Sequence, residues 1–225
     1  MIQQPVVSIA GCSLQLRGQT ILSDVDLTVA AGEIVAVVGA NGSGKSTLLR
    51  IIVGLIRPNS GSVALFGRRP DDIAARRRVG AAIDTPALYP WMSGRAALRT
   101  LLNLGGEKDD GRTDTALRRF GLGSVGRKPV LRYSQGMRKR LALAAASMSG
   151  PELLLLDEPT NALDEDGRDL VRNWLADHRR SGGSAVLATH RSFDASLCDR
   201  AVRLRDGRLA EISASAWTAE VAARD

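Results

Sequence analysis

The sequence predicts an α/β fold with a mainly parallel sheet and an inserted helical subdomain, and three observations support this class. Wholly apolar runs of strand length, such as 34–38 and 153–156, alternate with stretches of helical periodicity, as in sheets covered by helices on both faces. The first of these runs leads through a glycine-rich loop at 39–46 into a helix. Residues 85–149 contain few β-branched runs and several helical stretches, which predicts the helical subdomain.

The N-terminal part predicts a peripheral antiparallel β-subdomain followed by the first core elements. Residues 24–29 alternate polar and apolar side chains, as a half-buried strand does. We expect the strands before Asp24 and just after Asn59 to be antiparallel. A cluster of turn-forming residues at 57–61 ends the first helix. The elements expected here are strands at 24–29, 34–38, 62–66 and 79–83 and a helix at 45–56.

The later part of the chain returns to alternating strands and helices. Four leucines at 153–156 predict a buried strand, and Asp206-Gly207 is a strong turn signal for a hairpin. The helices expected in the insertion lie at 94–104, 112–120 and 134–149. The elements expected after it are a strand at 153–156, a helix at 165–180, strands at 184–188, 201–205 and 208–212, and a terminal helix at 215–223.

Length and composition favour one soluble cytosolic domain. The chain has 225 residues, and its apolar runs fall well short of the ~18 residues that a membrane-spanning helix needs. The N-terminus lacks the charged and apolar regions of a secretory signal. Cys12 and Cys198 match no metal-binding spacing, so we expect free thiols.

The formal net charge is +7, with basic clusters at 76–78, 118–119 and 138–140. Such clusters could face nucleic acid or an anionic membrane surface, or they could be solvated helix faces. We favour solvated faces, because the clusters are scattered and no aromatic residues are interleaved for base stacking. No nucleic-acid partner is therefore expected.

The glycine-rich loop predicts a P-loop NTPase core. Its order of strand, loop and helix is the one that a phosphate-binding loop requires, and its glycines allow backbone N–H groups to face phosphate oxygens. Lys45 would reach the β- and γ-phosphates, and the Ser46 hydroxyl would ligate Mg²⁺. The expected nucleotide-binding residues of the loop are Gly39, Ala40, Asn41, Gly42, Ser43, Gly44, Lys45, Ser46 and Thr47.

A second motif ends the leucine strand with two carboxylates, Asp157 and Glu158. Ligands of open α/β sheets bind at the carboxyl ends of strands, so these acids are expected near the P-loop. Asp157 would hold Mg²⁺ through water, and Glu158 would orient and polarise the attacking water. The alternative is that these are two solvated acids at an ordinary strand end. Their pairing with a P-loop argues against this alternative.

Between these motifs, residues 133–141 resemble the signature motif of ABC-type ATPases, whose usual form is Leu-Ser-Gly-Gly-Gln followed by a basic helix. Residues 161–164 resemble the D-loop of that family, and Thr189-His190 resembles its switch histidine. The five elements follow the family's order across 39–190. The resemblance implies one ABC ATPase domain over 1–225, with 1–84 and 150–225 as the nucleotide-binding core and 85–149 as the helical subdomain.

The resemblance also implies a homodimer in which each P-loop-bound ATP is capped by the signature of the other chain. Ser134, Gln135 and Gly136 would act in trans, and Ser134 is also a suitable N-cap for the signature helix. Asp164 would lie at the dimer seam. His190 would contact the γ-phosphate and join Lys45 and Glu158 as the catalytic group.

Three positions depart from the family pattern. Gln135 replaces the first glycine of the signature, which requires a compatible backbone angle. Asp84 stands where the Q-loop glutamine is usual, and either faces Mg²⁺ or its water shell or begins a loop. Arg17 lies near the usual adenine-stacking aromatic; either its guanidinium stacks on the base or adenine is loosely held.

The implied function is an ATPase subunit, converting ATP and water to ADP and phosphate, that powers a separate integral membrane permease. Asp84 and the residues after it resemble ABC-2-type, antibiotic and lantibiotic export ATPases, which favours export. Residues 88–92 either form part of a permease-docking groove or pack the helical subdomain. The expected location is cytoplasmic, peripheral on the inner face of the cell membrane.

Two other functions compete with transport. A non-transport ABC ATPase acting on ribosomes or DNA would fit the positive charge, but such proteins usually carry tandem ATPase domains or a long coiled-coil insertion. This chain has one copy of each motif and no sustained heptads. A regulatory module that holds ATP without turnover is the other alternative, and Glu158 argues against it.

Overall fold

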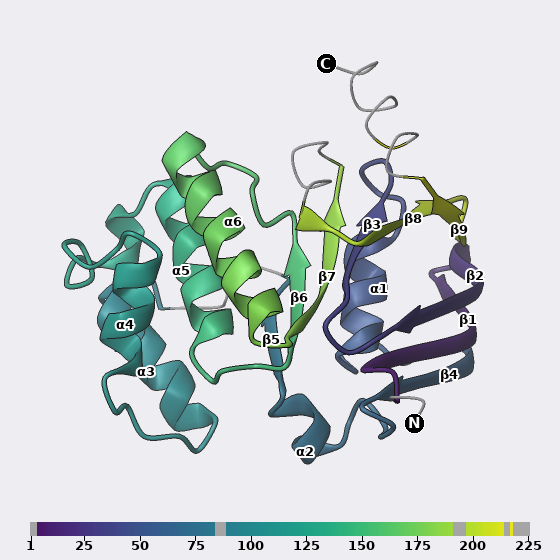
Figure 1. Cartoon of the computed structure of the whole chain (residues 1–225), viewed down its shortest axis with the longest axis horizontal. Coiled ribbons are helices and arrows are strands. Elements are labelled where there is room, and N and C mark those ends of the chain that lie inside the picture. The colour runs from purple at the N-terminus through teal and green to yellow at the C-terminus, as the bar shows by residue number, and fades with distance from the viewer. Residues whose placement is uncertain (1–3, 84–88, 191–196, 214–216, 218–225) are drawn as a thin grey trace.

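The computed structural model describes residues 4–83, 89–190, 197–213 and 217, and within them the strands form two sheets (Figure 1). The larger sheet has six strands in the order β5-β6-β7-β3-β8-β9. Its first five strands are parallel to their neighbours, and β9 pairs antiparallel with β8. The strands are β3 (Ile34–Val38), β5 (Val79–Ala82), β6 (Leu153–Asp157), β7 (Ser184–Thr189), β8 (Arg200–Arg205) and β9 (Arg208–Ile212).

The position of β6 explains why its first four residues are all leucine. Leu154 and Leu156 lie in one hydrophobic cluster with the helices of the insertion, whereas Leu153 and Leu155 lie in a second cluster on the opposite face. All four side chains are fully buried. A strand covered on both faces leaves no position for a polar alternation, so the predicted buried strand is confirmed.

The smaller sheet is antiparallel, as predicted, with the order β2-β1-β4. Its strands are β1 (Val7–Leu16), β2 (Gln19–Val29) and β4 (Ser60–Leu65). The strand expected at 24–29 is therefore the second half of a longer strand. A Cβ on Gly61 would lie 2.4 Å from the carbonyl oxygen of Gly11, so the β1–β4 contact requires glycine there.

The helix α1 (Lys45–Ile52) ends earlier than the predicted residue 56, because a glycine-based cap stops it. Gly54 has a left-handed φ of 73°, the Leu55 amide donates to Arg50, and the Gly54 amide donates to Ile51. The short helix α2 (Ile73–Arg76) was not predicted, since four residues carry no periodicity. α1 lies between the two sheets and shares one hydrophobic cluster with both (Figure 1).

The predicted helical insertion is present, and its helices gather on one side of the larger sheet (Figure 1). They are α3 (Gly94–Leu104), α4 (Arg112–Arg119), the 3₁₀ turn Val130–Arg132 and α5 (Gln135–Ser147). The helix α6 (Glu165–Arg180) belongs to the same cluster, where Trp174 meets Phe120 edge to face at 5.0 Å. The predicted α/β fold, with its parallel core, antiparallel sheet and helical insertion, is confirmed.

Two further expectations concern a terminal helix and membrane-spanning helices. The terminal helix predicted at 215–223 lies outside the described residues apart from Trp217, whose side chain is buried. Within the described part of the chain, every helix is too short or too polar to cross a membrane.

A buried histidine near the end of α6 gives the fold a pH dependence. His178 shares a hydrogen bond of 2.9 Å between its Nε2 and the carbonyl oxygen of Ser184, and burial lowers its pKa below the ordinary value. Because the folded state disfavours protonation, the contribution of His178 to stability is complete above about pH 6.5 and is lost as the pH falls through the folded-state pKa.

We expect His178→Gln to reduce this loss of stability in acid, since an amide cannot titrate but can still donate to Ser184. The measurement is the free energy of unfolding by denaturant at pH 7.5 and pH 5.5. Wild-type protein should lose stability along a slope of at most about 1.4 kcal/mol per pH unit that the variant lacks. Equal losses in the two proteins would contradict the assignment.

Candidate functional site

The candidate site lies where three neighbouring parallel strands end. β3 leads into the loop 39–44, β6 ends at Asp157 with Glu158 next, and β7 leads to His190. The register pairs Val38 with Thr189 and Asp157 with Ala188, so the three ends lie at one edge of the sheet. Segments far apart in the sequence are therefore brought together by strand pairing alone.

The loop after β3 depends on its glycines at particular positions. A Cβ on Gly39 would lie 2.5 Å from the carbonyl oxygen of Leu204 and 2.7 Å from the Oγ of Ser43. Gly42 and Gly44 have φ values of 80° and 103°, which other residues rarely adopt. The loop therefore packs tightly against β8 and turns sharply before α1 begins.

Lys45, the first residue of α1, is buried with its side chain 6% exposed. Its ammonium donates to the carbonyl oxygens of Gly39 at 2.8 Å and Ala40 at 3.1 Å, and lies 3.9 Å from the Oε1 of Glu158. Burial lowers the pKa of Lys45, and the nearby charges of Glu158 and Asp157 partly oppose this. The cation thus joins the loop to the end of β6.

Asp157 and Ser46 form the oxygen-rich part of the site. Their side chains are hydrogen-bonded, and the Oδ1 of Asp157 is buried without a hydrogen-bond partner among the described residues. Burial raises the pKa of Asp157, whereas the Ser46 hydrogen bond and the charges of Lys139 and Lys45 lower it. Mg²⁺ prefers a few protein oxygens together with phosphates and water, so these two residues fit that ion.

Glu158 and His190 meet directly. The Nδ1 of His190 lies 2.7 Å from the Oε1 of Glu158, and the other carboxylate oxygen is buried with no hydrogen-bond partner in the described part of the chain. Glu158 has a left-handed φ of 47°, which is costly for a residue with a side chain. Strain of this kind persists only where the surroundings hold it, and it points to a functional position.

The signature segment begins α5. Ser134 is its N-cap, and its Oγ accepts a hydrogen bond of 3.1 Å from the Met137 amide, as predicted. Gln135 is the first helical residue and is not among the described residues with positive φ, so the helix accommodates its side chain. A Cβ on Gly136 would lie 2.8 Å from the carbonyl oxygen of Ala162. The segment is therefore packed against residues 161–164 of its own chain.

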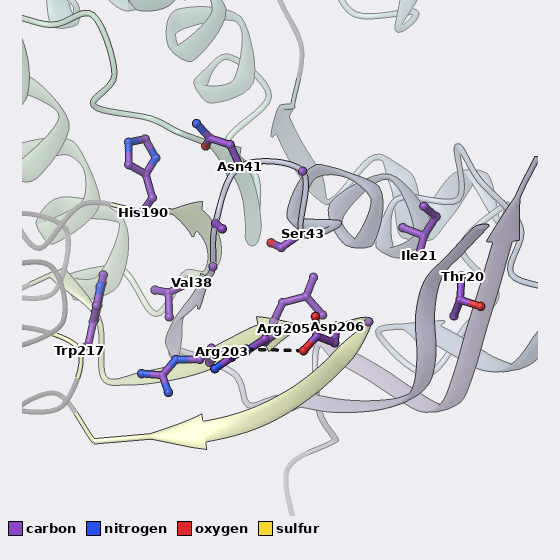
Figure 2. A pocket seen from close by; sticks show the side chains of 15 residues that line it. Thr20, Ile21, Val38, Asn41, Ser43, His190, Arg203, Arg205, Asp206 and Trp217 are labelled. Atoms are coloured by element: carbon purple, nitrogen blue, oxygen red, sulfur yellow. Dashed lines mark ion pairs between the residues drawn. The ribbon is translucent and has the colours of Figure 1, made fainter. Parts of the chain in front are cut away.

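A cavity of about 520 Å³ lies beside the P-loop (Figure 2). Its lining includes five loop residues and His190, and all six are site residues that the sequence predicts. The other lining residues come from β2, the end of β3, the β8–β9 hairpin and the C-terminal segment, and they are Thr20, Ile21, Val38, Arg203, Leu204, Arg205, Asp206, Gly207 and Trp217. The hairpin turn was recognisable from Asp-Gly, but no local signal indicated that it faces the loop.

The structure does not bring two of the predicted residues into this arrangement, and a third lies outside the residues that it describes. Arg17 is exposed in the β1–β2 turn with a φ of 50°, and the described cavity lining does not include it. Asp84 lies outside the described residues. Asp164 caps α6 by accepting a hydrogen bond of 2.9 Å from the Gly167 amide, which is a local structural role.

Fold and site together define a P-loop ATPase, and comparisons with known proteins identify its family. The family model described as ABC transporter matches residues 22–161. YdbJ of Bacillus subtilis (strain 168), an uncharacterised ABC transporter ATP-binding protein, is 40% identical over 215 residues, covering 93% of this chain and 70% of that protein. The chain therefore belongs to the ABC transporter family.

Two further comparisons agree with this assignment. The daunorubicin resistance ATP-binding protein DrrA3 of Streptomyces coeruleorubidus is 37% identical over 226 residues, covering 95% of this chain and 70% of that protein. A dimeric ATP-binding cassette solved in a post-hydrolysis state with ADP and Pi has a TM-score of 0.84 at 25% identity, covering 92% and 98% of the two chains. The chain is an ATP-binding ATPase subunit of an ABC transporter, as the resemblance implied.

Lys45→Ala should weaken ATP binding by more than about tenfold, because the charge-assisted contact that its ammonium is predicted to make with phosphate would be lost. Equilibrium titration with a fluorescent ATP analogue measures the affinity. Lys108→Ala, at an exposed lysine, is the matched control and should bind as the wild type does. Unchanged affinity in Lys45→Ala would refute the role of this lysine.

Proposed function

We propose that this chain hydrolyses ATP with magnesium at a site shared between two copies of itself, and so drives a separate integral membrane permease. The single observation that carries the proposal is the contact of Glu158 with His190 at 2.7 Å, beside the ammonium of Lys45 at 3.9 Å. A carboxylate held between a histidine and a lysine, at the end of a P-loop strand, is suited to act on water at a γ-phosphate.

In the proposed reaction, backbone N–H groups of the loop 39–44 and the Lys45 ammonium bind the phosphates. Ser46 and Asp157 would hold Mg²⁺, which when bound supplies positive charge that offsets the charge developing on the phosphates. Glu158 orients a water molecule and accepts its proton as the water oxygen attacks the γ-phosphorus. The bond from that phosphorus to the bridging oxygen breaks, giving ADP and phosphate.

The part of the shared site that a second copy would contribute is the N-terminus of α5. Ser134 and Gln135 are exposed at the N-terminus of a helix of 13 residues, where free N–H groups favour an anion. Together with Gly136 they would cap the ATP of a second copy, and Asp164 would lie at the dimer seam. The similarity to a dimeric ATP-binding cassette supports this arrangement.

The rim of the proposed site would include Arg17 against adenine and Asp84 facing Mg²⁺ or its water shell. We treat 1–225 as one ATPase domain, in which 1–84 and 150–225 form the core and 85–149 the helical subdomain. The proposed location is cytoplasmic, on the inner face of the cell membrane. Export is the proposed direction, supported by the resemblance after Asp84 and by the drug-resistance relative DrrA3.

A permease would dock beside the helical subdomain, and exposed aromatic residues support this position. Tyr89 and Trp91 are 58% and 72% exposed, and their rings lie 5.1 Å apart. Met92 instead packs partly against the core cluster of the helices. Two exposed aromatic rings on one short segment favour a docking role over packing of the subdomain.

Glu158→Gln should slow ATP turnover by at least about a hundredfold and trap an ATP-bound dimer, because the amide cannot accept a proton. Size-exclusion chromatography with ATP and magnesium, and separately with ADP, measures the oligomeric state. Glu211→Gln, at an exposed glutamate, is the control and should turn over normally. A Glu158→Gln protein that stays monomeric at saturating ATP and magnesium would sink the shared-site proposal.

A further inference from the structure

The peptide bond between Asp157 and Glu158 is held at both of its polar atoms. The Lys139 ammonium, on α5, donates to the Asp157 carbonyl oxygen at 2.5 Å. The Glu158 amide donates to the carbonyl oxygen of Ala188 at 2.8 Å. Because a peptide unit is planar, fixing its carbonyl and its N–H fixes the orientation of the whole plane.

This plane directly precedes the Cα of Glu158, so its orientation contributes to the φ of Glu158, which is left-handed at 47°. Because this conformation is strained for a residue with a side chain, it persists only where the surrounding contacts hold it. The Ala188 contact is a backbone hydrogen bond to β7, whereas the Lys139 contact comes from a flexible side chain on a separate helix. Of the two contacts that hold the peptide before Glu158, the one from Lys139 can therefore be removed by substituting a single side chain.

The helix α5 contacts the same segment in a second place. Gly136, three residues before Lys139 on the same helix, faces the carbonyl oxygen of Ala162, which would lie 2.8 Å from an added Cβ. Ala162 is also left-handed, with a φ of 63°. One face of the signature helix thus contacts the chain at both Asp157 and Ala162, on either side of Glu158 and the turn that follows it.

We propose that Lys139 is a positioning residue for ATP hydrolysis, which holds the Glu158 backbone so that its carboxylate faces the attacking water. This inference rests on the proposed function of Glu158 and adds a residue to it. Since Lys139 and the ATP-capping residues share α5, it also gives the signature helix a direct contact with the hydrolytic carboxylate of its own chain.

The test compares steady-state ATP hydrolysis of Lys139→Met, Lys139→Arg and the matched control Lys108→Met with that of the wild type. Lys139→Met should lower kcat by about ten- to hundredfold and change KM for ATP by less than about threefold, because the charge-assisted hydrogen bond that is lost goes to the backbone and not to the nucleotide. Lys139→Arg keeps a cationic donor and should recover most of kcat. Lys108→Met should match the wild type.

A double variant separates positioning from general destabilisation. If Lys139 acts through Glu158, single-turnover hydrolysis by Lys139→Met/Glu158→Gln should equal that of Glu158→Gln alone. A further loss in the double variant, a kcat of Lys139→Met within twofold of the wild type, or a failure of Lys139→Arg to recover activity would overturn the inference. Absence of turnover in the wild type would instead refute the proposed function, so the two failures are distinguishable.

Discussion

The buried ammonium of Lys45 is the interaction on which the rest of the site depends. It donates to two carbonyl oxygens of its own loop and faces the carboxylate of Glu158, which directly follows β6. A buried cation is tolerated only with such partners, so the loop, α1 and the end of β6 must keep one mutual arrangement. The parallel register of β3, β7 and β6 provides that arrangement, because it aligns the three strand ends.

The second constraint is the backbone of Glu158. Its left-handed conformation is held from β7 through Ala188 and from α5 through Lys139. The helical insertion is thereby joined to the core at the residue that we assign to hydrolysis. In the shared-site proposal, this contact would let the capping of one ATP affect the geometry at the other.

Much of this architecture is predictable from the sequence because its signals are local. The apolar run of β6, the strand–loop–helix order around Lys45 and the Asp-Gly hairpin each specify their own structure. The early end of α1 was missed because a capping glycine, Gly54, outweighed the helical periodicity after it. The Lys139 contact could not be predicted, because it joins two segments whose approach is set by helix packing.

The most direct test of the account mixes two inactive variants, Lys45→Ala and Ser134→Arg, and measures ATP hydrolysis. If each site combines the P-loop of one chain with the signature of the other, half of the randomly formed dimers contain one intact site. The mixture should then recover up to about a quarter of wild-type activity, although each variant alone is inactive. A mixture no more active than its separate components would contradict the shared site.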